Sequence, residues 1–177
     1  MCAGAHAGAE DMEHSGLYYG AVYYIENVPP EQIREDLAAM EAAEMNVVCF
    51  EGAGWQSWEP EAGRFALEQL ETVLRLCRET ALEAVIAVPG WPVPERLKGA
   101  SDEEIFSSNL GLLEKLKALG AEYEATAFQV DGRQPEGSAL ARFQTAYLQE
   151  RGCSVTALSP LESAADPFVQ TGAQHFG

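Results

Sequence analysis

Five side chains that could recognise a ligand gather in the stretch from Asn46 to Pro60, which reads NVVCFEGAGWQSWEP. Its start, Val47 to Phe50, is an apolar run typical of a buried strand. The residues that could do chemistry follow it directly: Glu51, Trp55, Gln56, Trp58 and Glu59. Indole rings can pack on the apolar face of a sugar, while carboxylate and amide groups bind its hydroxyls. The stretch has the groups that a carbohydrate site needs, although composition alone favours the alternative, in which Trp55 and Trp58 fill a corner of the core.

The elements that must position these residues alternate between strands and helices. Runs rich in β-branched and aromatic residues predict strands at 17–25, 47–50, 84–88 and 123–130. Apolar residues that recur every three or four positions predict helices at 29–43, 67–77, 101–120 and 138–151. Such alternation is typical of parallel strands joined by right-handed crossovers. We therefore expect the α/β class, with about four βα units.

In parallel sheets the functional residues collect beyond the carboxyl ends of the strands. That rule selects eight residues: Glu26 and Asn27 after the first strand, Glu51, Trp55 and Glu59 after the second, Trp91 after the third, and Asp131 and Glu136 after the fourth. Each one alone has an ordinary explanation as a solvated charge or a packed ring. Their convergence on one rim is the stronger indication of a site.

The charge of the chain restricts its partners. Its 28 acidic and 11 basic residues give a formal net charge of −17, so the field of the protein repels nucleic acid and anionic membranes. A small neutral saccharide meets no such repulsion. No apolar run approaches the roughly 18 residues of a membrane span. Residues 1–14 lack the basic and apolar regions of a secretion signal, and a cytoplasmic location is the default expectation.

Metal and disulfide chemistry have little support in the sequence. The cysteines are scattered without a metal-binding pair: Cys2, Cys49, Cys77 and Cys153. Of these, Cys49 and Cys77 fall within a predicted strand and a predicted helix, which indicates buried thiols. The histidines all fall in predicted tails: His6, His14 and His175. We therefore expect no metal site and no cofactor.

Several short motifs together carry a family resemblance. They are YYIEN at 23–27, PEQ at 30–32, EDL at 35–37, MNVV at 45–48, and W-x-x-W-E-P-x-x-G-R-F at 55–65, followed by residues 82–89 and PERL at 94–97. Residues 18–97 thereby resemble the N-terminal part of family 42 glycoside hydrolases, the β-galactosidases. The spacing from Trp55 to Phe65 is shared across the wider retaining clan, and FQVD at 128–131 resembles the family's fourth strand more loosely.

The resemblance implies a (β/α)8 barrel that cleaves β-galactosides with retention, using one glutamate as acid/base and another as nucleophile. The family's fourth strand ends in Asp-Asn-Glu, whose glutamate is the acid/base, whereas Gly132 and Arg133 follow Asp131 here. Glu136 and Asp131 are the catalytic candidates that remain. Cys49 stands where the family has an arginine, and the nucleophile belongs to a seventh strand for which this chain leaves no room.

The length of the chain predicts only part of such a barrel. A complete one takes about 250 residues, against 177 here. We expect a disordered tail at 1–16, a partial (β/α)8 barrel at 17–152 and an irregular segment at 153–177. Because an open half leaves unpaired sheet edges and an uncovered inner face, a second copy that completes the barrel is the expected protein partner.

Three functional hypotheses follow, and the residues leave all three open. The first is a β-galactosidase-like hydrolase, which predicts turnover of β-galactosides. The second is a non-catalytic relative whose aromatic rim binds a sugar or a partner chain, which predicts binding without turnover. The third is a barrel enzyme that uses Glu26, Glu51 or Asp131 on a metal, which predicts activity lost to a chelator.

Overall fold

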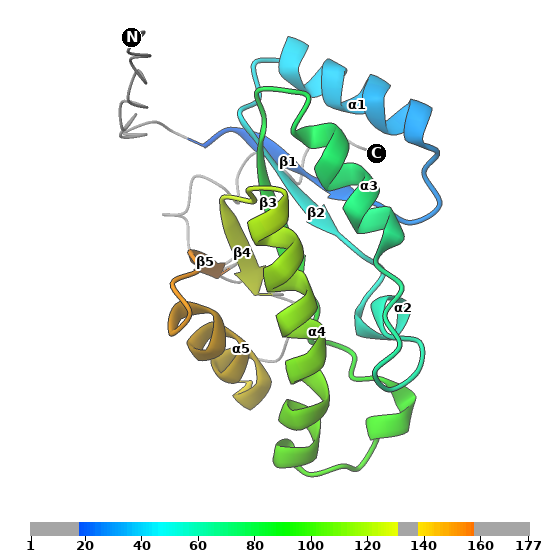
Figure 1. Ribbon diagram of the computed structural model, residues 1–177, viewed down its shortest axis with the longest axis vertical. Coiled ribbons are helices and arrows are strands. Elements are labelled where there is room, and N and C mark those ends of the chain that lie inside the picture. Colours follow the sequence, from blue (N-terminus) through cyan, green and yellow to red (C-terminus); the bar gives the residue numbers. More distant parts are fainter. Residues whose placement is uncertain (1–17, 131–137, 158–177) are drawn as a thin grey trace, which may run out of the picture.

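The fold is a parallel sheet covered by helices, seen here in a computed structural model that describes residues 18–130 and 138–157 (Figure 1). The elements run β1 (Gly20–Tyr24), α1 (Pro30–Ala42), β2 (Val47–Glu51), α2 (Trp55–Trp58), α3 (Glu68–Cys77), β3 (Glu83–Val88), a 3₁₀ turn η1 (Glu95–Leu97), α4 (Asp102–Glu122), β4 (Ala127–Val130), α5 (Ala139–Gln149) and β5 (Val155–Ala157). The alternation of strands and helices expected from the sequence is confirmed.

All pairings between neighbouring strands are parallel, and the strands lie in the order β1-β2-β3-β4-β5. Each strand therefore pairs with the next one along the chain, as in a (β/α)8 barrel. The central strands are almost entirely buried, which explains why their sequences are continuous apolar runs rather than alternating ones. The expected class, α/β with a partial barrel, is the observed one.

The fifth strand was missed by the sequence analysis, which expected an irregular segment from residue 153 onwards. β5 pairs with β4 in the register Phe128↔Val155 and Val130↔Ala157. A strand of three residues shows no readable alternation, and only the edge of β4 makes it a strand. This correction adds a strand to the four that were expected.

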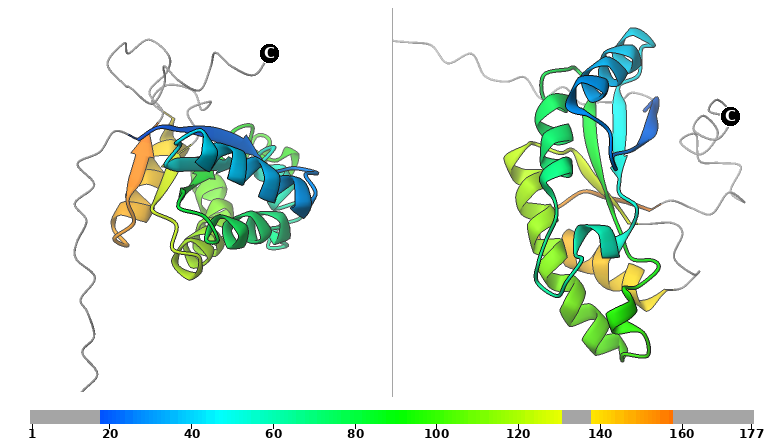
Figure 2. Two further views of the ribbon diagram at one scale, coloured as in Figure 1. Left: turned by 90° about the horizontal axis from the view of Figure 1, so that it is seen from above. Right: turned by 90° about the vertical axis from the view of Figure 1, so that its right-hand side faces the viewer.

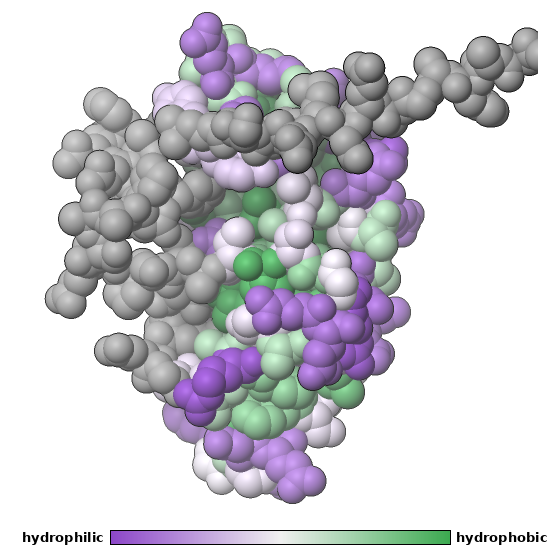
Figure 3. All heavy atoms as spheres, turned by 90° about the vertical axis from the view of Figure 1, so that its left-hand side faces the viewer, coloured by the Kyte–Doolittle hydropathy of each residue, from purple (hydrophilic) through white to green (hydrophobic). Residues whose placement is uncertain are grey.

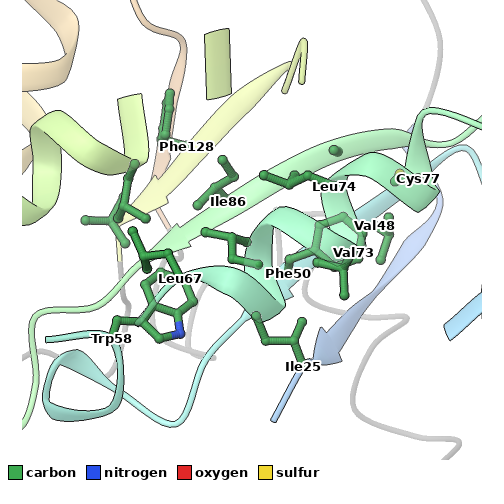
Figure 4. Packing of buried hydrophobic residues seen from close by; sticks show 14 of the residues in the cluster. Ile25, Val48, Phe50, Trp58, Leu67, Val73, Leu74, Cys77, Ile86 and Phe128 are labelled. Carbon is green, nitrogen blue, oxygen red and sulfur yellow. The ribbon is translucent and has the colours of Figure 1, made fainter. Parts of the chain in front are cut away.

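The long helices lie on one face of the sheet (Figures 1 and 2). Buried residues of α1, α3, α4 and α5 join one apolar cluster with the side chains that β2, β3 and β4 direct toward the helices, and Figure 4 shows part of this packing around Phe50 and Ile86. The stripes predicted from three- and four-residue spacing are these buried faces. Ser101 and Glu104 form the expected capping box at the start of α4.

The opposite face of the sheet carries a second, smaller apolar cluster. It consists of Val47, Cys49, Val85, Ala87 and Ala127, with Val22 packed against it. These residues alternate along their strands with the helix-facing ones, as the pleat requires. Within residues 18–130 and 138–157, no helix combines the length and the apolar character that crossing a bilayer requires.

Candidate functional site

The carboxyl ends of β1, β2 and β3 meet at one end of the sheet, which we call the mouth. Glu26, after β1, accepts a hydrogen bond at Oε1 from the backbone N–H of Ala53, after β2. The loop after β2 is joined in turn to the segment after β3, because Arg96 reaches Glu59. β3 and β4 end side by side, with Val88 in register with Val130. The convergence predicted from the sequence is thus present for the described strands.

At the mouth, α2 forms a buried corner rather than an open sugar platform. The chain turns into this single helical turn at Gly54, whose φ is 132°, a conformation that favours glycine. Trp55 is 0% exposed, and its Nε1 donates to Glu59 Oε2 at 2.6 Å. No ring face of Trp55 is left for a saccharide, so its predicted stacking role is not supported by this geometry.

Glu59 is also buried in the fold, since only 1% of it is exposed. Arg96 places Nη2 2.9 Å from Glu59 Oε2 and donates from Nη1 to the Glu59 carbonyl oxygen at 3.1 Å. Gly63 donates its backbone N–H to Glu59 Oε1 at 2.8 Å. Both carboxylate oxygens therefore accept hydrogen bonds from the protein itself. The predicted substrate-binding role of Glu59 gives way to a structural one, as the partner of Trp55 and Arg96.

Trp58 completes this corner. It is buried in the main apolar cluster, where Figure 4 shows its ring beside Leu67. Its indole also lies directly over Gly52, since a Cβ built there would come within 2.2 Å of Trp58 Nε1. Of the two interpretations that the sequence left open for Trp55 and Trp58, the structure favours packing in the core.

Trp91 differs from both other tryptophans because 47% of it is exposed. It lies three residues beyond β3, in the loop of residues 89–94 that leads to η1. This loop is held at its far end by the hydrogen bonds from Arg96 to Glu59. Trp91 is therefore the one exposed tryptophan of the three, and its role in binding stays a prediction.

The remaining substrate-binding candidates lie at the same end of the sheet in different settings. Glu26 is half-buried and bound to Ala53, as described above. Asn27 is exposed and has a φ of 60°, so it serves the turn that leads from β1 toward α1. Glu51 ends β2 in register with Tyr24 of β1. The catalytic candidates Asp131 and Glu136 lie outside the described residues.

Cys49, which the resemblance places where the family has an arginine, lies on the sheet face away from the helices. Its Sγ donates to Gln129 Oε1 of β4 at 2.8 Å. Burial first, and the nearby negative charge of Glu51 second, raise the pKa of the Cys49 thiol far above its usual range. The group is therefore a neutral, unreactive thiol and supplies no cation to a sugar.

Three polar residues at this end of the molecule were missed by the sequence analysis. Arg96 holds Glu59, and the buried amides of Asn109 and Gln144 contact each other. A signal for the amides was present, because Gln144 falls on the apolar stripe between Leu140 and Leu148. A polar residue on such a stripe indicates a buried hydrogen bond. No spacing rule could have paired Arg96 with Glu59.

Within the described ranges, nowhere do three or more histidine, cysteine, aspartate or glutamate side chains come together as ligands.

Comparison with known proteins identifies relatives among the glycoside hydrolases. Residues 22–108 match the model of glycoside hydrolase family 42, described as beta-galactosidase. Beta-galactosidase Bga of Halorubrum lacusprofundi is 33% identical over 82 residues, which make up 44% of this chain and 12% of that protein. The chain therefore spans a small part of this relative.

Solved structures have the same fold. A beta-galactosidase from Halorubrum lacusprofundi superposes with a TM-score of 0.58 at 20% identity, and one from Marinomonas ef1 with 0.54 at 18%. Both matches cover 69% of this chain and 22% of the other. A family 39 glycoside hydrolase from Bacteroides cellulosilyticus WH2 gives 0.57 at 10% identity, over 77% of this chain and 31% of its own. These matches show that the chain is similar to the N-terminal part of the family 42 β-galactosidases and shares the fold of that part of their barrel.

Proposed function

We propose that this protein is a β-galactosidase-like glycoside hydrolase. It binds a small neutral saccharide, a terminal β-galactoside, at the mouth of its sheet and hydrolyses it. The observation that carries the proposal is the match of residues 22–108 to the β-galactosidase family. Trp91 is the side chain on which the sugar packs, because it is the exposed indole at the mouth and follows a central strand. Its ring contacts the apolar face of the pyranose.

The hydrolysis that we propose is a retaining reaction by two carboxylates about 5 Å apart, one protonated and one ionised. Glu136, which follows β4 in the sequence, is the proposed acid/base, and Asp131, five positions before it, is the second catalytic candidate. The described carboxylates at the mouth are less suited to these roles. Glu59 is buried in an ion pair with Arg96, and Glu26 accepts the Ala53 N–H. The described part of the mouth therefore contributes binding, and the chemistry depends on residues beyond it.

The test of hydrolysis is turnover of a chromogenic β-galactoside by the purified chain. We expect slow release of the chromophore, with loss of the signal in Glu136→Gln, because an amide cannot donate the proton that the leaving group needs. Glu150→Gln, an exposed change on the solvent side after α5, is the matched control and keeps the wild-type rate. Product analysis by NMR would show the β-anomer first in a retaining reaction. Activity that survives Glu136→Gln contradicts this assignment.

A second function, binding without turnover, is favoured by one specific observation. Cys49 occupies the place of the family's arginine as a buried neutral thiol bonded to Gln129. A sugar pocket without that cation keeps its aromatic contact but has one charged donor fewer. Calorimetric titration with galactose and lactose separates the two functions. Binding that weakens about fivefold in Trp91→Ala, with no detectable turnover, supports this alternative.

We also propose that a second copy of the chain is the protein partner. In the described sheet β1 and β5 are the edge strands, and each offers backbone groups on its outer side. An apolar strip lies between hydrophilic regions on the side of the molecule that is at the left in Figure 1 (Figure 3). Sedimentation equilibrium tests this partner directly. Twice the chain mass of 19.2 kDa is expected, and a monomer at all concentrations contradicts it.

A further inference from the structure

Two buried amide side chains hold the beginning of the loop that carries Trp91. Gln144 of α5 donates from Nε2 to the carbonyl oxygen of Pro89 at 3.0 Å, just past the end of β3. The same nitrogen donates to Asn109 Oδ1 of α4, also at 3.0 Å. A primary amide nitrogen has two hydrogens, so these two bonds use both of them. Gln144 thereby ties α4, α5 and the Trp91 loop together at one atom.

Burying two amide side chains costs free energy of folding, which argues that this arrangement is more than ordinary packing. Asn109 and Gln144 are both 0% exposed. Each lies among leucines on its own helix: Leu112 and Leu113 follow Asn109, and Leu140 and Leu148 flank Gln144 by one turn. Leucine at either position would bury apolar surface without desolvating an amide. Asn109 Nδ2 even remains without an acceptor among the described residues. The fold therefore tolerates a destabilising pair at this point.

The Trp91 loop is held at both ends. Gln144 binds the carbonyl of Pro89 at its start, and Arg96 binds Glu59 at its far end. Between these two clamps lies Trp91, a residue that is 47% exposed. Side-chain packing alone does not set the direction of so exposed a ring. The backbone of the loop does, and the two clamps fix that backbone.

We propose that Gln144, through its hydrogen bond to the Pro89 carbonyl, is a positioning residue that sets the placement of Trp91 at the mouth. The role in sugar binding rests on the function proposed above, whereas the structural coupling between Gln144 and Trp91 does not. Gln144 contacts the loop and not the saccharide. Loss of Gln144 therefore changes the position of Trp91 and leaves unchanged the set of groups that contact the sugar.

The experiment compares Gln144→Leu with Asn109→Leu. Both changes remove one member of the buried amide pair, but only Gln144→Leu frees the Pro89 carbonyl, because in Asn109→Leu the bond from Gln144 to Pro89 can persist. The readout is acrylamide quenching of tryptophan fluorescence. Trp55 and Trp58 are buried, so quenching reports mainly on Trp91, and Trp91→Phe gives the background. A neutral quencher avoids repulsion by the acidic protein.

We expect the quenching constant of the Trp91 component to change in Gln144→Leu and to stay near the wild-type value in Asn109→Leu. Circular dichroism and a thermal unfolding transition check that both variants are folded. If Gln144→Leu does not fold, Gln144→Met removes the same bond with a side chain of similar length. An unchanged quenching constant in a folded Gln144 variant overturns the proposal, and so does an equal change in both variants.

A saccharide titration then tests the functional consequence. Galactose affinity should fall about tenfold in Gln144→Leu, because a buried carbonyl loses its donor and the loop shifts. Asn109→Leu should bind like the wild type. Equal affinities in all three proteins contradict a role for the clamp in binding. If the wild type binds no galactose, the proposed function fails while the quenching comparison still decides whether Gln144 positions Trp91.

Discussion

Trp55 and Trp91 follow neighbouring strands at the same end of the sheet, yet they have opposite roles in the structure. Trp55 is fully buried and donates to Glu59, which Arg96 also binds. Trp91 lies in a loop with half of its surface exposed. The difference comes from the local chain: a helical turn places Trp55 and Glu59 four residues apart on one side, whereas residues 89–94 form no helix.

This comparison shows how the residues of a motif at the mouth can be used for packing within the fold. The spacing from Trp55 to Phe65 is one of the motifs that carry the resemblance, and its central members form a buried hydrogen-bonded corner. Through Arg96 that corner holds the next loop, and the next loop carries the exposed indole. The motif therefore acts on the mouth indirectly, through the backbone.

The strongest test of the comparison removes the carboxylate from the buried corner. Glu59→Ala leaves Arg96 Nη2, Trp55 Nε1 and the Gly63 N–H without their carboxylate acceptor, and we expect a loss of about 3 kcal/mol in the free energy of unfolding. Urea denaturation followed by circular dichroism measures it. Glu61→Ala is the matched control, because Glu61 makes only an exposed pair with Arg64 and should change stability little. Equal effects of the two variants would argue against a structural Glu59.

A second test compares the two indoles directly. Trp55→Phe keeps an aromatic ring but loses the donor to Glu59 and leaves a cavity, so a loss of about 2 kcal/mol is expected. The midpoint and slope of urea unfolding give this value. A fully buried Trp55 that could be replaced without any loss of stability would contradict the corner described here.

A third test asks whether burial also controls the ionisation of the Cys49 thiol, in the strand that precedes this corner. The pKa of the Cys49 thiol is raised, so the folded protein keeps the proton while the unfolded chain releases it above about pH 8.5. Stability is therefore complete below that pH and falls above it, by about 1.4 kcal/mol per pH unit for one such thiol. Burial also raises the pKa of Cys77, to about 11, which adds to the decline.

Urea unfolding between pH 8 and 10 measures this dependence. The decline should be less steep in Cys49→Ala than in the wild type, after allowance for the packing that the change removes. Parallel curves for the two proteins would mean that the Cys49 thiol ionises in the folded state.

The smallest effect on stability is expected at the exposed indole. Trp91→Phe should change the free energy of unfolding by less than about 0.5 kcal/mol, as surface substitutions commonly do. Thermal and urea unfolding check this beside Trp55→Phe. A large loss of stability in Trp91→Phe would remove the contrast between the two tryptophans and the argument for a free ring at the mouth.

Much of the fold could be predicted because its signals are local. The four-strand pattern, the helix stripes and the capping box at Ser101 depend on residues a few positions apart, and the structure contains all of them. The convergence of Glu26, Glu51 and Trp91 at one end follows from parallel strands in sequential order. These rules could place the candidate residues at one end of the sheet, although the burial and contacts of each one could not be predicted.

What could not be predicted depends on contacts between distant residues. The ion pair of Glu59 depends on Arg96, which lies in η1 after the next strand. The hydrogen bond to the Pro89 carbonyl depends on Gln144, which lies on α5. β5 forms only because β4 offers it an edge. Burial likewise separates Trp55 from Trp91, and burial belongs to the folded molecule rather than to either residue's neighbours in sequence.

The sequential strand order has a consequence for how the molecule is made. Every new strand hydrogen-bonds to its immediate predecessor, from Gly20 with Val47 through to Phe128 with Val155. During synthesis from the N-terminus, each strand leaving the ribosome meets a partner that has already emerged. The sheet can thus grow one βα unit at a time in the direction of translation, without waiting for the last residues of the chain.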